Sequence, residues 1–342
     1  MDVIAIMNTI RDNASADYQD RVPEATRDNM ESIRYAMISD DNVMVANEFM
    51  QTLLNKLVKS ILITKRFENP LKSLKKGKKP LGDTIEEIYV NFIKGQQPDF
   101  EGAQLLKREL PDVKTVYHRM NYHMQYPVTV DRRQLSRAFM SVDTLESFIS
   151  GIINSLYNSA DLDEFANMKQ LLGSALDKGA LKMVDVVDPM ASETNGKEFI
   201  KMVKTVSRLM TFPSDEWNTY ATISGDNTPL KTFSRKDEQI LILDAGVDTS
   251  LNVDVLASTF NMSVAEFNDT RKIIIDAFPT TAKGKVVGVL VDEQFFQVYD
   301  DFFAMTNFFN GRGVYQNYYL NVDQTMAYSI LVNGVAFVVK TA

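Results

Sequence analysis

The chain of 342 residues contains no cysteine, which excludes disulfide bonds and thiolate chemistry and is typical of a protein from a reducing compartment. It also lacks any apolar run near the roughly 18 residues that a membrane span requires. The stretch from Met1 to Met7 is too short and too acidic for a secretory signal peptide. These absences predict a soluble intracellular protein with no membrane partner.

The sequence also lacks the common motifs of catalysis and cofactor binding: a Gly-x-Ser-x-Gly elbow, a zinc-binding histidine pair and a dinucleotide glycine fingerprint. Residues 225–232 resemble a phosphate-binding loop, but Leu230 replaces its second glycine and Pro229 distorts it. His118 and His123 lie five apart in an expected strand, so they point to opposite faces and do not share a metal. The acidic cluster 161–164 is expected to be a solvated helix face. We therefore predict no enzyme, no metal and no cofactor.

The most informative positive feature is a lysine-rich turn in an acidic chain. Arginine and lysine number 37 against 45 acidic residues, giving a net charge of −8, so a duplex-wrapping protein is disfavoured. Between Pro70 and Pro80 the sign reverses at five residues: Lys72, Lys75, Lys76, Lys78 and Lys79. A solvated loop is one interpretation. Nucleic-acid binding is disfavoured because no aromatic residues interleave, so the functional interpretation is an acidic protein partner.

The first third of the chain predicts an arm, a helix and a hairpin. Residues 1–39 are polar and acid-rich and are expected to have little core of their own. Apolar residues recur at helical spacing from Asn42 to Leu62. Two strand-like runs, about 85–92 and 113–122, predict a long two-stranded hairpin. An isolated hairpin is marginal in water, so it must pack against another element, or against another subunit if its own domain lies elsewhere.

The rest of the chain predicts a mixture of helices and strands. Apolar residues at helical spacing run from Leu145 to Ala175, before Gly179, and predict a helix on the order of 50 Å long. A further helix is expected at 197–210. Strands at 240–243, 273–275 and 286–291, with a helix at 252–260, form a small α/β module with a buried sheet. Residues 314–320 and 326–339 are strand-rich.

Several stretches resemble the major head (capsid) proteins of small short-tailed phages of the phi-29 type. They run in the same order through roughly residues 40–340. The stretches are Asn69-Pro-Leu-Lys, Lys75-Lys-Gly, Pro80-Leu-Gly, Thr84-Ile-Glu-Glu-Ile-Tyr, Arg108-Glu-Leu-Pro-Asp-Val-Lys-Thr, Phe148-Ile-Ser-Gly-Ile-Ile-Asn, Tyr157-Asn-Ser-Ala, Leu251-Asn-Val-Asp-Val-Leu-Ala, Phe260-Asn-Met, Val289-Leu-Val-Asp and Asn317-Tyr-Tyr.

The resemblance implies an α+β chain with the Hong Kong 97-like phage capsid fold. The expected parts are an N-terminal arm and first helix (1–65), an extended hairpin or E-loop (66–130), a peripheral domain (131–209) with a spine helix at about 141–178, an axial domain (210–310) and return strands of the peripheral domain (311–342). The phi-29 head protein is expected to carry an added immunoglobulin-like domain, whereas this sequence stops at Ala342. A chain without that domain is the expectation.

The resemblance also implies the partners of a virion protein assembled in the host bacterial cytoplasm. These are other copies in hexamers and pentamers, a scaffolding protein during assembly, a portal or connector at one vertex, and packaged double-stranded DNA through weak non-specific contact. The head is icosahedral or prolate. An encapsulin-like compartment for protein cargo is the alternative within this fold, and a soluble enzyme or nucleic-acid-binding module is the alternative outside it.

For mechanism, we expect each hairpin to lie across a neighbouring subunit with its lysines near an acidic patch there. Replacing Lys75 and Lys78 by glutamate should then stop assembly without unfolding the subunit. The candidates for contact between subunits are Lys72, Lys75, Lys76, Lys78, Lys79, Glu86, Glu87, Arg108 and Arg119.

Overall fold

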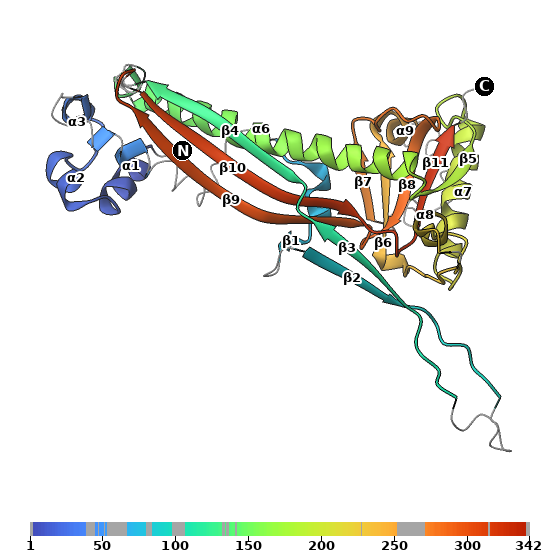
Figure 1. Ribbon diagram of the computed structural model, residues 1–342. Helices are drawn as coiled ribbons and strands as arrows, with labels where there is room; N and C mark the ends of the chain where they lie inside the picture. Colours follow the sequence, from blue (N-terminus) through green and yellow to red (C-terminus); the bar gives the residue numbers. More distant parts are fainter. Residues whose placement is uncertain are drawn as a thin grey trace. The chain divides into compact units, whose positions relative to one another are not determined.

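The computed structural model describes residues 3–38, 45–46, 48–50, 52, 67–79, 84–97, 107–131, 134, 137–140, 142–226, 228–251, 271–313 and 315–339. The chain divides into two compact units. Unit 1 comprises Met1–Asn69, Tyr122–Glu164 and Asp301–Asp323; unit 2 comprises Pro70–Asn121, Phe165–Asp300 and Gln324–Ala342. Figure 1 labels the helices and strands of both.

The N-terminal segment of unit 1 is helical: α1 is Val3–Asp12, α2 is Ala16–Arg21 and α3 is Met30–Ile38. The hydroxyl of Ser15 accepts a hydrogen bond from the Tyr18 amide and so caps α2. Ile10, Ile33 and Met37 are fully buried in the core of the unit. The expectation of an arm with little core was therefore wrong, because its few apolar residues share one packed cluster. The helix predicted at 42–62 lies mostly outside the described residues, of which 45–46, 48–50 and 52 are helical.

The sheet that contributes to unit 1 has the strand order β1-β9-β10-β4. Strand β1 is Gly77–Lys78, β4 is Tyr122–Asp131, β9 is Phe296–Asn310 and β10 is Tyr315–Tyr328. Alternate residues of β10, namely Tyr318, Leu320 and Val322, join the core of unit 1. Strand β9 was not predicted, because adjacent phenylalanines interrupt any alternation of apolar and polar residues.

The long helix α6 is Val142–Asp177, which confirms the helix predicted at about 141–178. Its 36 residues correspond to about 54 Å. The helix ends in a Schellman motif at Gly179, whose φ of 74° favours glycine. The amide of Ala180 donates to the Ala175 carbonyl at 2.6 Å, and the Gly179 amide donates to the Leu176 carbonyl at 3.0 Å. A local signal therefore sets the end of this helix.

Unit 2 contains a five-stranded sheet with the order β5-β11-β8-β6-β7. The strands are β5 Lys182–Val186, β6 Gln239–Asp244, β7 Arg271–Ile275, β8 Lys285–Asp292 and β11 Gly334–Val339. Helix α7, Glu193–Leu209, packs its residues Phe199, Val203 and Val206 against one face of this sheet. The shorter helix α9, Ala245–Ser250, contributes to the same cluster. The predictions of β6, β7, β8 and α7 are confirmed. The helix predicted at 252–260 lies outside the described residues.

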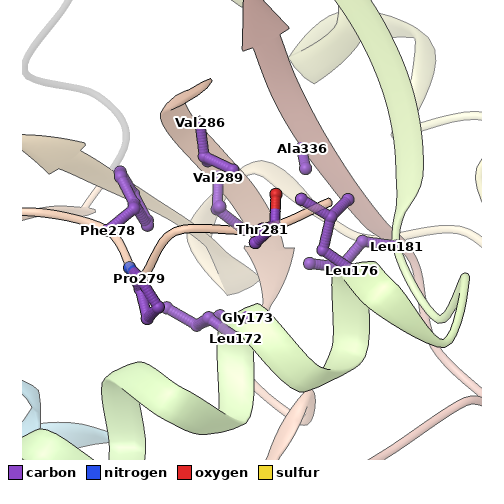
Figure 2. Close-up of a pocket in the computed structure, with 10 residues that line it drawn as sticks. All are labelled: Leu172, Gly173, Leu176, Leu181, Phe278, Pro279, Thr281, Val286, Val289 and Ala336. Atoms are coloured by element: carbon purple, nitrogen blue, oxygen red, sulfur yellow. The ribbon is translucent and has the colours of Figure 1, made fainter. Parts of the chain in front are cut away.

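The C-terminal part of α6 packs near the other face of this sheet, where a small apolar pocket remains (Figure 2). Leu172 and Leu176 of α6 line it together with residues of the segment 278–281 and of strands β8 and β11. Gly173 permits a close approach here: a Cβ atom at that position would lie 3.1 Å from the Cβ of Pro279, which would have to shift by a few tenths of an ångström. Close packing, rather than a ligand site, explains this glycine.

The sheet of unit 2 differs from the domain division expected from the sequence. Strand β11 lies between β5 and β8, parallel to the former and antiparallel to the latter. The boundary expected at 310 therefore separates β11 from β8, although the two strands are hydrogen-bonded to each other. The partners of β11 lie far away in sequence, with Val335 opposite Lys182 in β5 and Leu290 in β8, so no local pattern indicates them.

Candidate functional site

An exposed element of unit 2 is the hairpin formed by β2, Thr84–Val90, and β3, Val113–Arg119. The strands pair antiparallel, with Thr84 opposite Arg119 and Val90 opposite Val113. A two-stranded hairpin was predicted, and it is confirmed over a shorter range than 66–130. Because directly opposite residues share a face, the register divides the side chains into two sets.

One set, here called the outward face, consists of Thr84, Glu86, Ile88, Val90, Val113, Thr115, Tyr117 and Arg119. Its apolar members are unusually accessible: Ile88 is 60% exposed, Tyr117 63% and Val113 48%. The Tyr117 hydroxyl donates to Glu86 Oε1 at 2.9 Å, and this hydrogen bond raises the pKa of Tyr117. Contiguous exposed apolar residues with a polar border are typical of an interaction surface.

The other set, the inward face, consists of Ile85, Glu87, Tyr89, Lys114, Val116 and His118, and it contacts the same chain. His118 is buried and lies 2.6 Å from Glu87, measured from Nε2 to Oε2. Glu87 also acts electrostatically on Lys76. The hairpin therefore has one face committed to its own chain and one face left open.

The lysine-rich turn precedes the hairpin and is anchored by short elements. The 3-10 helix η2, Pro70–Leu74, buries Leu71 and Leu74. Strand β1, Gly77–Lys78, pairs parallel with β9, and Gly77 has a φ of 89° that favours glycine. The amides of Lys76 and Lys79 donate to the carbonyls of Val298 and Asp300 at 2.9 and 3.0 Å. The turn is thus held at a defined position on β9.

The five lysines fall into different environments. Lys75 is 11% exposed at its side chain and pairs with Asp300 at 2.8 Å. Lys76 donates to the Glu293 carbonyl at 2.9 Å. Burial lowers the pKa of Lys76, although the negative charges of Glu293 and Asp292 act to raise it. Lys72 and Lys78 are exposed, and Lys79 is half-buried. Lys75 and Lys76 therefore make contacts within the chain. A contact with a second copy stays a prediction for all five lysines, and the side chains of Lys72 and Lys78 are the exposed ones.

The remaining candidate residues are distributed over the hairpin. Glu86 and Arg119 lie on the outward face, Glu87 lies on the inward face, and Arg108 is exposed beyond the paired strands. The sequence reasoning missed the apolar members Ile88, Val90, Val113 and Tyr117 as site residues. Both stretches were predicted as strand-like runs, but without a pairing register the runs did not show which face is covered.

The other sequence features have structural roles. The expectation that His118 and His123 share one strand was wrong. β3 ends at Arg119 and β4 begins at Tyr122, so the two histidines lie in different strands. Within the acidic cluster, Glu164 is buried and accepts from Asn69 Nδ2 at 2.9 Å, so it is not a solvated position.

No group of three or more His, Asp or Glu residues suited to a metal occurs in the part of the chain that the structure describes. Over the same ranges, no helix is long and apolar enough to cross a bilayer.

Comparison with known proteins gives a consistent result. The family model described as "Phi29-like phage major capsid protein" matches residues 7–338. Among curated relatives, the major capsid protein of Bacillus phage PZA is 38% identical over 339 residues, covering 97% of this chain and 72% of the relative. That of Bacillus phage B103 is 36% identical with the same coverage. Among solved structures, a chain in the capsid structure of Staphylococcus phage Andhra has a TM-score of 0.66 at 14% identity, covering 82% of this chain and 87% of that one.

Proposed function

Since this chain belongs to the Phi29-like phage major capsid protein family and has the Hong Kong 97-like capsid fold, we propose that the outward face of the hairpin is its main assembly surface toward a second copy. The observation that carries this proposal is the exposure of Ile88, Val90, Val113 and Tyr117 on one face of a hairpin whose other face is bound within the chain. Covering these side chains in a neighbouring subunit removes apolar area from water.

The proposal extends to the assembled head and its other components. Copies form hexamers and pentamers of an icosahedral or prolate head that encloses packaged double-stranded DNA, with a scaffolding protein during assembly and a portal at one vertex. Assembly takes place in the host cytoplasm. The net charge of −8 favours weak, non-specific contact with DNA. The role is structural and no catalytic step is assigned.

The basic turn supplies the polar part of the same contact in this proposal. Lys72 and Lys78 face solvent, while the chain as a whole is acidic, so a second copy offers complementary charge. Exposed ion pairs are worth only about 0–1 kcal/mol each. A shell repeats each pair in every subunit, and weak repeated contacts allow a misplaced copy to detach during growth.

To test this proposal, the wild-type chain and an Ile88→Glu variant are expressed in bacteria, and both are examined by electron microscopy and sedimentation. We expect closed shells from the wild type and unassembled, folded subunits from Ile88→Glu, because a charge is placed in the apolar contact. Ile88→Val, which keeps the surface apolar, is the matched control and should form shells. Normal shells from Ile88→Glu would overturn the assembly surface, and absence of shells from the wild type would overturn assembly of this chain without a scaffolding protein.

A further inference from the structure

We propose that residues 220–226 and 228–233, here called the hairpin clasp, fix the direction in which the hairpin leaves its own subunit, with Asn91 and Lys114 as the positioning residues. The clasp contains helix α8, Tyr220–Ser224, and the loop that follows it. The proposal deepens the proposed function and rests on it, because it concerns how the assembly surface is aimed. Both the clasp and the hairpin belong to unit 2.

The apolar part of the contact joins the inward face to a small buried cluster. Tyr89 and Val116 pack against Tyr220, Leu230 and Leu331. Leu230 is 1% exposed, so the loop presents a buried anchor rather than a solvated turn. Further along, the ring of Phe92 stacks on Phe233 with centroids 6.3 Å apart. These contacts hold one face of the ribbon without using the outward face.

The polar part matches the hairpin to the backbone of the loop. The side-chain amide of Asn91 donates to the Pro229 carbonyl at 3.3 Å and accepts from the Lys231 amide at 3.4 Å. The Tyr89 hydroxyl donates to the Lys231 carbonyl at 2.5 Å. One asparagine therefore satisfies both a donor and an acceptor of the loop, as a neighbouring strand would. Such a pair of bonds restricts both distance and angle.

A charged contact fixes the opposite strand. Lys114, 11% exposed at its side chain, pairs with Asp226 at 2.6 Å and with Asp112 at 3.0 Å. Thr228 donates its hydroxyl to the other Asp226 oxygen at 2.7 Å and so orients the carboxylate. The hydrogen bond from Lys114 lowers the pKa of Asp226 to about 2, and the same bond raises the pKa of Lys114. The pair is therefore charged throughout the neutral range.

The position of these contacts along the ribbon gives them their effect. One end of the paired strands, at Thr84 and Arg119, lies next to Asn121, whose side chain donates to the Met326 carbonyl and accepts from the Met326 amide at 2.8 Å each. The clasp holds the opposite end, at residues 89–92 and 112–116. At about 3.4 Å per residue, six residues separate the two points by roughly 20 Å. Two fixed points define a direction, whereas a two-stranded ribbon held at one end alone would pivot and is marginally stable. Each copy would then offer its outward face at the same angle.

The test uses an Asn91→Ala, Lys114→Met double variant, which removes the polar contacts of these two side chains, keeps the hydrogen bond of the Tyr89 hydroxyl and leaves the outward face intact. Amide hydrogen exchange of unassembled full-length subunits should rise roughly tenfold or more in strands β2 and β3, while that of the five-stranded sheet is unchanged. Particles from the double variant should be heterogeneous in size and shape. Lys231→Met is the matched control, because this residue contributes its backbone and not its side chain; it should behave as wild type.

Two further variants separate positioning from general destabilisation. Asp226→Asn removes the ion pair from the loop side and should reproduce the faster exchange of the hairpin. Lys114→Arg keeps the charge and should restore much of the protection. Unchanged hairpin exchange and uniform particles in the double variant would overturn the clasp, while normal shells from Ile88→Glu would overturn the assembly surface. The two failures are therefore distinguishable.

Discussion

Helix α6 and the β2–β3 hairpin are both long elements rich in apolar residues, yet they differ in what covers those residues. In α6, Leu145, Leu156 and Met168 are at most 1% exposed. In the hairpin, Ile88 and Tyr117 are more than half exposed. The same residue types therefore differ in their surroundings: in the helix they hold the subunit together, and in the hairpin they stay exposed and form the surface that we propose for a second copy. Coverage, rather than composition, distinguishes a core from an assembly surface.

The largest expected effect concerns the core side of this comparison. Ile152 of α6 is 6% exposed in the core of unit 1, so Ile152→Asp buries an unpaired charge. An uncompensated buried charge costs about 3–5 kcal/mol, a large part of the stability of a domain. We expect loss of soluble subunit, measured as the soluble fraction on expression. Ile152→Val, which costs about 0.5–1.5 kcal/mol, is the control and should remain soluble. A folded Ile152→Asp subunit would contradict the assignment of this helix to the core.

A smaller effect is expected where α6 ends. Gly179 adopts a left-handed conformation, so Gly179→Ala should destabilise the chain by about 1–2 kcal/mol. No side-chain clash contributes, because the structure shows no atom within 4 Å of an added Cβ. Denaturant unfolding measures the change, with Gly151→Ala within the helix as the comparison. Since Gly151 is helical and equally unobstructed, that variant should be neutral or more stable. Equal stability of the two variants would argue against a backbone origin.

The smallest effect on folding is expected at the exposed lysines. Lys72→Glu with Lys78→Glu should change the free energy of unfolding by less than about 0.5 kcal/mol, as is usual for surface positions. The same double variant should reduce shell formation, because the charge offered to an acidic neighbour is reversed. Lys75→Glu is a poor test of this point, since it places a carboxylate beside Asp300 in its own subunit. Shells formed by the double variant as efficiently as by the wild type would remove the basic turn from the assembly surface.

Much of the local structure could be predicted from the sequence. Helical spacing and Gly179 located α6 to within one residue at each end. Continuous β-branched and apolar runs located β6, β7 and β8. Two strand-like runs on either side of a polar region located the hairpin. These signals are local: they depend on periodicity, on backbone preference at single residues, and on runs shorter than ten residues.

What the sequence by itself determined is therefore a part of the elements, among them α6, the hairpin and strands β6 to β8, the acidic chain with its lysine-rich turn, and, through ordered likeness to a family, the kind of protein. Only the tertiary structure decided that β11 lies between β5 and β8, that Lys75 and Lys76 are used within the chain, and which hairpin face is open. The physical reason is that coverage of a side chain depends on partners distant in sequence. Lys75 meets Asp300, 225 residues away, and Asn91 meets the loop at Lys231, 140 residues away. No local pattern carries that information.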